Sequence, residues 1–206
     1  MAHETKRIAI IYLIVFIIGI VFMVVMVAKL AMSQSGQTQG GIIMNDVNET
    51  DDNNPYNGLR ALALNAEQTQ EMTDALEGSP VFAAVVDMDV DWAVATLACF
   101  ADGTVSLYYS SGGGQMGLGQ ADEEIRTAAI AFLRSAEQVL GVMEKTDTYP
   151  LPQNGKHIVY LKTTDGTYMQ TLDMETINGE SRELQFLNFL YQNVLAKIGA
   201  HIERTQ

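Results

Sequence analysis

The chain is poor in cysteine, proline and histidine. Its 206 residues include one cysteine, four prolines and three histidines. A single cysteine cannot form an intramolecular disulfide, so a core must hold the fold together. For a domain outside the cytoplasm, this absence is more typical of bacteria than of eukaryotes. The only histidines after residue 30 are His157 and His201, so side chains that could act as a general base near neutral pH are scarce.

Basic residues are also scarce. The chain has 12 Lys and Arg against 25 Asp and Glu, a net charge of −13. Residues 30–206 hold nine of the basic and 24 of the acidic residues, so this part carries −15. Such a surface repels phosphate backbones and anionic headgroups, which excludes nucleic acid as a direct partner. The acidity favours solubility in the simplest interpretation, and basic partners or cations are the alternative.

A single long apolar run lies near the start of the chain. Residues 8–28 read IAIIYLIVFIIGIVFMVVMVA, without a charge or a proline. At about 1.5 Å per residue a helix of this length reaches roughly 32 Å, enough to cross a hydrocarbon core of about 30 Å. We therefore predict one transmembrane helix over 8–28. The alternatives are a signal peptide cleaved near Ala31-Met32-Ser33 and a core helix, which would need a larger protein around it.

The charges that flank this run predict its orientation. Lys6 and Arg7 precede it, whereas only Lys29 follows it closely. Basic residues favour the cytoplasmic side, so residues 1–7 should be cytoplasmic and the C-terminal part extracytoplasmic. The predicted location is the cell membrane, with a single pass.

Residues 29–57 read as a polar, acidic tether. They are rich in Ser, Gln, Gly, Asn and Asp and show no apolar periodicity. Counted from Asp46, the acidic cluster fails the calcium-loop pattern, because Asp51 stands where Gly is needed and Asn57 where Glu is needed. We expect the folded domain to be residues 58–206.

The domain alternates between strand and helix patterns. Helical periodicity predicts helices over 66–76 and 121–143, and a last helix that follows Ser181 and stops at Gly199. Apolar runs and two Asp-Gly turns predict strands over 81–86, 92–100, 104–110, 158–164 and 167–172, and YPLP at 149–152 connects the two halves. The predicted fold class is α+β, an antiparallel sheet of about five strands with packed helices. By analogy its order is profilin-like or roadblock-like.

The most unusual stretch of the domain is rich in glycine. We predict a binding surface at Gly112, Gly113, Gly114, Gln115, Met116 and Gly117. Three of these glycines match GxGxxG, but the preceding strand belongs to a hairpin, and Asp122, Glu123 and Glu124 would repel a pyrophosphate. No cofactor is therefore expected. A purely structural turn that needs positive φ angles is the alternative.

Three further features have simpler interpretations. Ser110 or Ser111 could be a nucleophile with glycine N–H groups as an oxyanion hole, but His157 and His201 look like ordinary polar surface. Asp87, Asp89 and Asp91 alternate on one strand face at about 6.6 Å spacing, too far apart for one ion, so we expect a solvated face. Cys99 is expected to be a small buried apolar residue.

Four short pieces of the sequence carry a resemblance. They are SLYYSSGGGQMG at 106–117, FL at 132–133, YPLP at 149–152 and TTDG at 163–166. Together they resemble a pattern in an uncharacterised family of bacterial proteins, to which no activity is attached. The resemblance covers roughly residues 80 to 175 and implies a bacterial origin and one contiguous domain.

From the sequence we expect a membrane-anchored, non-enzymatic interaction or accessory domain outside the cytoplasm. Its partners would be the membrane, through residues 8–28, and a protein of the envelope. The alternatives are a membrane-tethered hydrolase that uses Ser110 or Ser111, and an extracytoplasmic ligand-binding domain.

Overall fold

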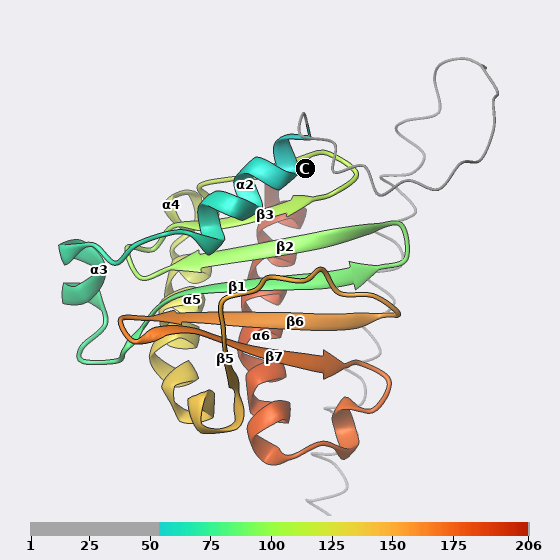
Figure 1. Cartoon of the computed structure of the whole chain (residues 1–206). Helices are drawn as coiled ribbons and strands as arrows, with labels where there is room; N and C mark the ends of the chain where they lie inside the picture. The colour runs from blue at the N-terminus through green and yellow to red at the C-terminus, as the bar shows by residue number, and fades with distance from the viewer. Residues whose placement is uncertain (1–53, 206) are drawn as a thin grey trace, which may run out of the picture. The chain divides into compact units, whose positions relative to one another are not determined.

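The computed structural model describes residues 54–205 of the chain, in which a sheet carries helices on both faces (Figure 1). The strands are β1 Val81–Val90, β2 Ala93–Phe100, β3 Val105–Tyr109, β4 Gly114–Gln115, β5 Glu144–Thr146, β6 Lys156–Thr163 and β7 Gly166–Asp173. The helices are α2 Pro55–Leu64, α3 Gln70–Ala75, α4 Leu118–Ala121, α5 Glu123–Ala136 and α6 Arg182–Thr205, with 3₁₀ turns η1 Glu137–Val142 and η2 Ile177–Gly179.

The seven strands form one sheet in the order β4-β3-β2-β1-β6-β7-β5, and every pair is antiparallel. The central strand β1 is apolar along most of its length and is buried on both faces. The predicted Asp-Gly hairpins are confirmed, since they connect β2 to β3 and β6 to β7. Gly103 and Gly166 have φ angles of 87° and 133°, which L side chains rarely adopt.

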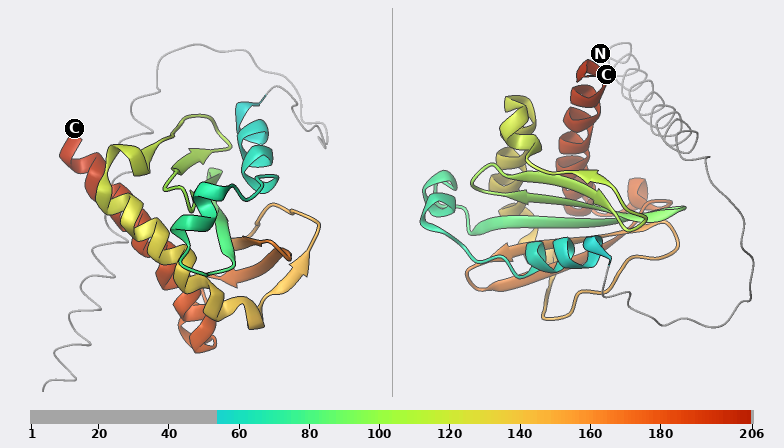
Figure 2. Two further views of the ribbon diagram at one scale, coloured as in Figure 1. Left: turned by 90° about the vertical axis from the view of Figure 1, so that its left-hand side faces the viewer. Right: turned by 90° about the horizontal axis from the view of Figure 1, so that it is seen from above.

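One face of the sheet is covered by α5 and α6, which pack side by side (Figure 2). The apolar stripe predicted for the first of these helices is confirmed: Ile125, Ala129 and Phe132 are buried against the sheet. From α6, Leu187, Tyr191 and Val194 enter the same core. This is the larger of the two apolar clusters in the described part of the chain.

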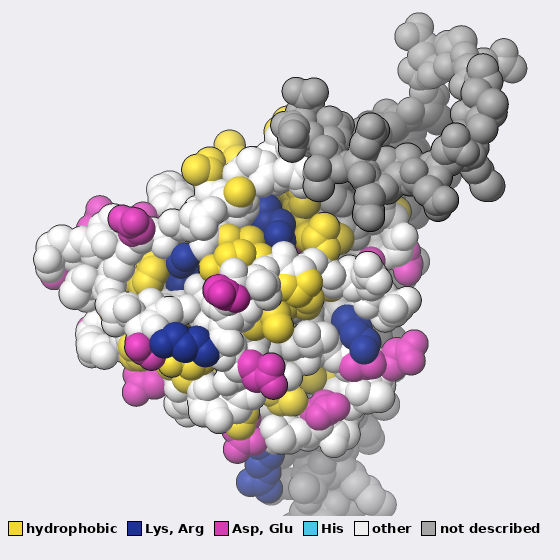
Figure 3. All heavy atoms as spheres, in the orientation of Figure 1, with side chains coloured by type: hydrophobic (Ala, Val, Ile, Leu, Met, Phe, Trp, Pro, Cys, Tyr) yellow, Lys and Arg dark blue, Asp and Glu magenta, His cyan; other side chains and the backbone are white. Residues whose placement is uncertain are grey.

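The opposite face is covered in part by α2 (Figure 2), and Figure 3 shows this face with its side chains in the orientation of Figure 1. Asn54 caps this helix by accepting a hydrogen bond from the N–H of Tyr56, and Pro55 occupies the first turn, where its missing N–H costs nothing. The helix buries Tyr56, Ala63 and Leu64 against strands β1, β2, β3 and β6. Residues 54–57, which we assigned to the tether, thus belong to this element.

The predicted fold class needs correction. The α+β class is observed, but the sheet has seven strands rather than about five, so the profilin-like or roadblock-like order of five strands is wrong. The two missed strands, β4 and β5, are two and three residues long and mostly exposed. Such short polar strands show no alternation of apolar and polar residues, so no sequence pattern predicts them.

Three predicted helices also have different bounds in the structure. The helix expected over 121–143 is divided, because Asp122 is extended and caps α5 by accepting from the N–H of Glu124, and after Ala136 the chain continues as the 3₁₀ turn η1. The helix expected over 66–76 is shorter, because Asn65 ends α2 and Thr69 is the residue that caps α3. At the C-terminus, α6 continues through Gly199 to Thr205. A glycine inside a helix costs about 1 kcal/mol, and here the buried Ile198 and the bonds of His201 and Arg204 to Asp122 stabilise the last turns.

The transmembrane helix predicted over 8–28 lies outside the described residues, as does most of the tether. Between residues 54 and 205, none of the helices combines the length and apolar character that a membrane crossing requires.

Candidate functional site

The glycine-rich stretch forms a hairpin at one edge of the sheet. After β3 the chain turns through Ser111, Gly112 and Gly113 and returns as β4, which pairs Gly114 with Tyr108 and Gln115 with Leu107. The glycines at 112, 113, 114 and 117 all have positive φ angles. A Cβ on Gly114 would lie 2.6 Å from the backbone of β3, so only glycine fits there. The structural interpretation of these glycines is therefore correct at Gly114.

The hairpin leaves one side of its backbone without a strand partner. Tyr109 donates its N–H to the carbonyl of Gly113, and hydrogen-bonded pairs alternate along an antiparallel ladder. Leu107 and Gln115 form the next such pair, so the backbone groups of Gly114 point away from β3. In the described sheet, β4 is the outermost strand. An extended chain could pair with this edge.

Exposed side chains accompany this edge. Residues 111–116 are all exposed, and Met116 keeps 67% of its surface accessible. At the β1–β2 turn, Trp92 is 44% exposed and its ring lies 5.4 Å from that of Tyr109. We define Trp92, Tyr109 and residues 112–117 as the hairpin edge.

The structure does not bring together the residues of the hydrolase alternative. Ser110 has a backbone role: its Oγ accepts a hydrogen bond of 2.8 Å from the N–H of Val94. His157 lies on β6, and strands β2 and β1 separate β6 from β3. Three strand spacings amount to about 14 Å, well beyond the reach of a proton transfer between these side chains.

Both histidines have structural partners. His157 is buried, in contrast to the surface position we expected, and its Nδ1 lies 2.8 Å from the hydroxyl of Tyr191. Burial disfavours the imidazolium and lowers the pKa of His157 to about 4. His201 lies 2.8 Å from the carboxylate of Asp122, and this contact contributes most to lowering the pKa of Asp122 to about 2.

The expected solvated face of three aspartates is wrong for Asp87. Its side chain is fully buried, whereas Asp89 accepts a hydrogen bond from the N–H of Gly155 and Asp91 lies in the exposed β1–β2 turn. The prediction failed because the partner of Asp87 lies 27 residues away and no local pattern reveals it. The expectation for Cys99 is confirmed: it is buried, and burial raises the pKa of its thiol.

Asp87 belongs to a buried polar cluster beneath α2. Arg60 donates from Nε to its carboxylate at 2.8 Å, and the Thr96 hydroxyl donates to it at 2.6 Å. The hydroxyl of Tyr56 lies 3.0 Å from that of Thr96. Burial raises the pKa of Tyr56 to about 12. Tyr108 completes the cluster, and its buried hydroxyl has no partner among the described residues. We call these five residues the α2 latch.

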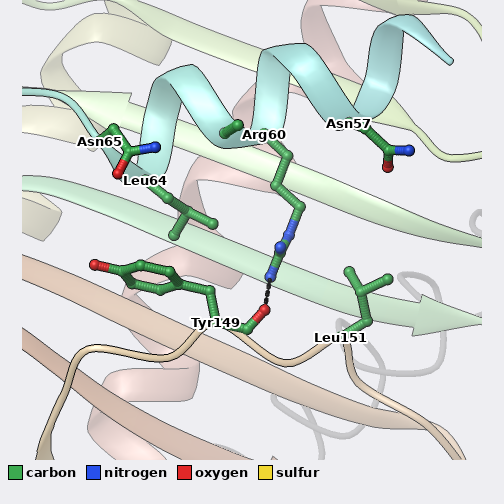
Figure 4. Close-up of a pocket in the computed structure, with 7 residues that line it drawn as sticks. Asn57, Arg60, Leu64, Asn65, Tyr149 and Leu151 are labelled. Carbon is green, nitrogen blue, oxygen red and sulfur yellow. Dashed lines mark hydrogen bonds between the residues drawn. The ribbon is translucent and has the colours of Figure 1, made fainter. Parts of the chain in front are cut away.

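The same helix borders a shallow hollow of about 220 Å³ (Figure 4). Arg60 reaches from α2 to the carbonyls of Tyr149 and Pro150, so the YPLP connector forms the opposite wall. Leu64 and Leu151 supply apolar lining. The volume lies below the roughly 300–1,000 Å³ typical of small-molecule sites, and the donors of Arg60 that face the connector are occupied. This hollow is a poor candidate for a substrate site.

Within residues 54–205, no cluster of His, Cys, Asp and Glu has the composition to hold a metal ion. Comparison with known proteins gives no family either: no protein-family model, no curated protein and no solved structure matches this chain.

Proposed function

We propose that this chain is a membrane-anchored interaction protein whose folded domain binds a protein partner outside the cytoplasm without catalysing a reaction. The apolar run at 8–28 and its flanking charges support the location. The geometry of the described residues supports the interaction. Ser110 and His157 have separate structural roles, and the buried charges of the α2 latch are paired with each other rather than directed into a cleft.

The single observation that carries the proposal is the hairpin edge. It combines an outward-facing backbone at Gly114 with exposed side chains of Met116 and Trp92. Aromatic residues and methionine are enriched at protein interfaces, where flexible thioethers adapt to a partner. An unpaired strand edge supplies backbone hydrogen bonds to an extended chain.

The charge of the domain indicates the chemistry of the partner. Residues 54–205 hold nine Lys and Arg against 20 Asp and Glu, a net charge of −11. The carboxylates of Asp89 and Asp91 lie at the same end of the sheet as Trp92. The partner that fits this edge is therefore an extended, basic segment of another envelope protein.

A photo-crosslinking amino acid at Met116 tests the proposal in cells that make the chain naturally. We expect a crosslink to one partner, located in an extended basic segment, and competition by a synthetic peptide of that segment. The matched control carries the same amino acid at Leu62, which is 72% exposed on α2, away from the hairpin edge.

Two variants separate contact from folding. Gln115→Lys and Met116→Ser leave the glycine backbone intact and change stability by about 0.5 kcal/mol or less. With the photo-crosslinking amino acid placed at Trp92, both variants should reduce crosslinking several-fold, because the first repels a basic segment and the second removes an apolar contact. If crosslinking is equal from 116 and 62, or is unchanged in both variants, the hairpin is only a structural turn.

The proposed location has its own test. A cysteine at Ser35, in a Cys99→Ser background, should react with a membrane-impermeant maleimide on intact cells. Labelling that requires lysis would place the domain in the cytoplasm and contradict the proposal.

A further inference from the structure

The outer face of α6 is unusual for a helix on an acidic domain. From Leu184 to Ala196 the helix contains no charged residue. Its outward stripe, which recurs every three or four residues, consists of Arg182, Gln185, Phe189, Asn193, Ala196, Ala200 and Glu203. Charges occur only at the two ends of this stripe, and Phe189 is 62% exposed near its middle. A stripe of this kind, depleted in charge around an aromatic residue, is typical of an interface.

A hollow lies beside the stripe, between α5 and α6. It measures about 300 Å³ and is lined by Thr127, Ala128 and Ala131 of α5 and by Asn193 of α6, with Glu123 and the Glu124–Lys197 ion pair on its remaining wall. Asn193 is one helical turn from Phe189, so the protruding ring and the hollow lie next to each other on the same face of the molecule. A surface that carries both a protrusion and a recess can be complementary to itself, as a twofold interface requires.

We propose that α6 is the centre of a symmetric dimer, in which two copies pack their α6 helices antiparallel about a twofold axis between Gln192 and Asn193. With the axis there, the numbers of any two residues that face each other across it add up to 385. Phe189 then lies against Ala196 of the second copy, beside its hollow. Large side chains meet small ones, as helix packing favours.

Charge selects this arrangement over the parallel one. In the antiparallel pair Arg182 of each copy meets Glu203 of the other, whereas a parallel pair would place Arg182 against Arg182 and Glu203 against Glu203. Neither residue forms an ion pair with another of the described residues. Antiparallel helices also align their dipoles favourably. Since each domain carries −11, most other contacts between two copies are opposed by repulsion.

The size of the stripe fits a weak dimer. From Arg182 to Glu203 it extends over about 32 Å of helix. A contact made by one helix pair is small among specific interfaces, so we expect a weak dimer. Attachment of both copies to one surface would raise their effective concentration. We call the outward stripe of α6 and the adjacent hollow the dimer face. It shares no residue with the hairpin edge, so this inference does not depend on a partner at that edge.

Site-specific crosslinking of the full chain tests the geometry. With Asn193→Cys, a short bis-maleimide should link two copies efficiently, because this position lies next to the axis. Cys99 is buried and stays unreactive. Thr171→Cys, exposed on β7, is the matched control and should give no crosslink. Equal crosslinking at positions 193 and 171 would overturn the proposal. The absence of a crosslink at 193 would also overturn it, and is the result expected if the copies associate only through residues 8–28.

Charge reversal tests the register. Arg182→Glu alone and Glu203→Arg alone should each weaken the dimer by about tenfold or more, and the double variant should restore it. Phe189→Asp should weaken it by about 30-fold or more, with Leu62→Asp as the control that leaves dimerisation and folding unchanged. Sedimentation velocity of the full chain in detergent measures these constants. Failure of the double variant to rescue, while both single variants remain folded, would reject the antiparallel register.

Discussion

The two faces of the sheet are stabilised in different ways. Beneath α5 and α6 lies a dry core of aliphatic and aromatic side chains such as Phe132, Leu161 and Val194. Beneath α2 the apolar cluster is smaller, and the α2 latch places a paired charge inside it. Apolar burial is tolerant of exchange between similar side chains, whereas a buried charge depends on its one partner. The helix-pair face therefore supplies stability, and the α2 face supplies a defined position for a single helix.

The largest expected effect tests the helix-pair face, the side of the sheet that α5 and α6 cover. Phe132 is 1% exposed at the centre of the helix-pair core. Phe132→Ala should lower the free energy of unfolding by about 3–5 kcal/mol, because it removes apolar contacts and leaves a cavity. Urea denaturation followed by circular dichroism measures the change, which should be the same at low and high salt. A loss below about 1 kcal/mol would mean that this face is loosely packed.

On the α2 face, the loss of one buried charge should lower the free energy of unfolding almost as much as Phe132→Ala does on the other face. Arg60→Met leaves the carboxylate of Asp87 buried without its cation, at a cost of about 3 kcal/mol or more. Replacing both residues, as Arg60→Met with Asp87→Val, should recover most of that loss. Hydrogen exchange should show the single variant losing protection in α2 before the sheet. If the double variant is as unstable as the single one, packing rather than charge holds this helix.

On the helix-pair face, the buried His157 makes stability depend on pH. Because burial lowers the pKa of His157 from 6.5 to about 4, the folded state binds fewer protons than the unfolded state between these values. Stability should thus fall as the pH decreases from about 6.5 to 4, by at most about 3 kcal/mol, and then level off. His157→Gln removes this component. The difference between the two pH profiles, from urea titrations, isolates the histidine, and identical profiles would contradict its burial as a neutral group.

The smallest effect concerns the start of α2. Asn54 accepts from the N–H of Tyr56, and its amide donates to the carbonyl of Ser110. Asn54→Ala should cost about 1 kcal/mol. Asn54→Asp keeps the cap but loses the donor, so it should retain part of that energy. Thermal unfolding distinguishes the two, and equal losses would show that the link to Ser110 matters more than the cap.

What the sequence could predict follows the same division between faces. The helix-pair face repeats its apolar residues at regular intervals, so the stripe at Ile125, Ala129 and Phe132 and the strands beneath it were predictable. The α2 latch was not, because Arg60 and Asp87 recognise each other only after the chain has folded. Pro55 and Asn54 did offer a local signal for the start of α2, which the polar composition of the neighbouring residues concealed.

The candidate site shows a similar limit. Composition singled out residues 112–117, but whether glycine is needed depends on the distance to the facing strand, which decides the matter at Gly114. For the dimer face, the sequence contains no motif that marks it as a contact surface. Its meaning depends on which side of α6 faces the sheet, and that is a property of packing. Contacts between distant residues thus carry the information that periodicity lacks.

The position of α2 has a mechanical consequence. Any pull on the chain ahead of Asn54 enters the domain through this helix, which crosses the strands and is attached to β3 at Ser110, to β1 at Asp87 and to β6 at Lys162, whose ammonium donates to the carbonyl of Leu64. Such a load would break these attachments one after another, starting from Asn54, because they lie in sequence along the helix and do not share the load equally. The helix α2 would detach first, and its unwinding would lengthen the chain by about 20 Å. The sheet would therefore remain folded at forces that have already detached and unwound α2.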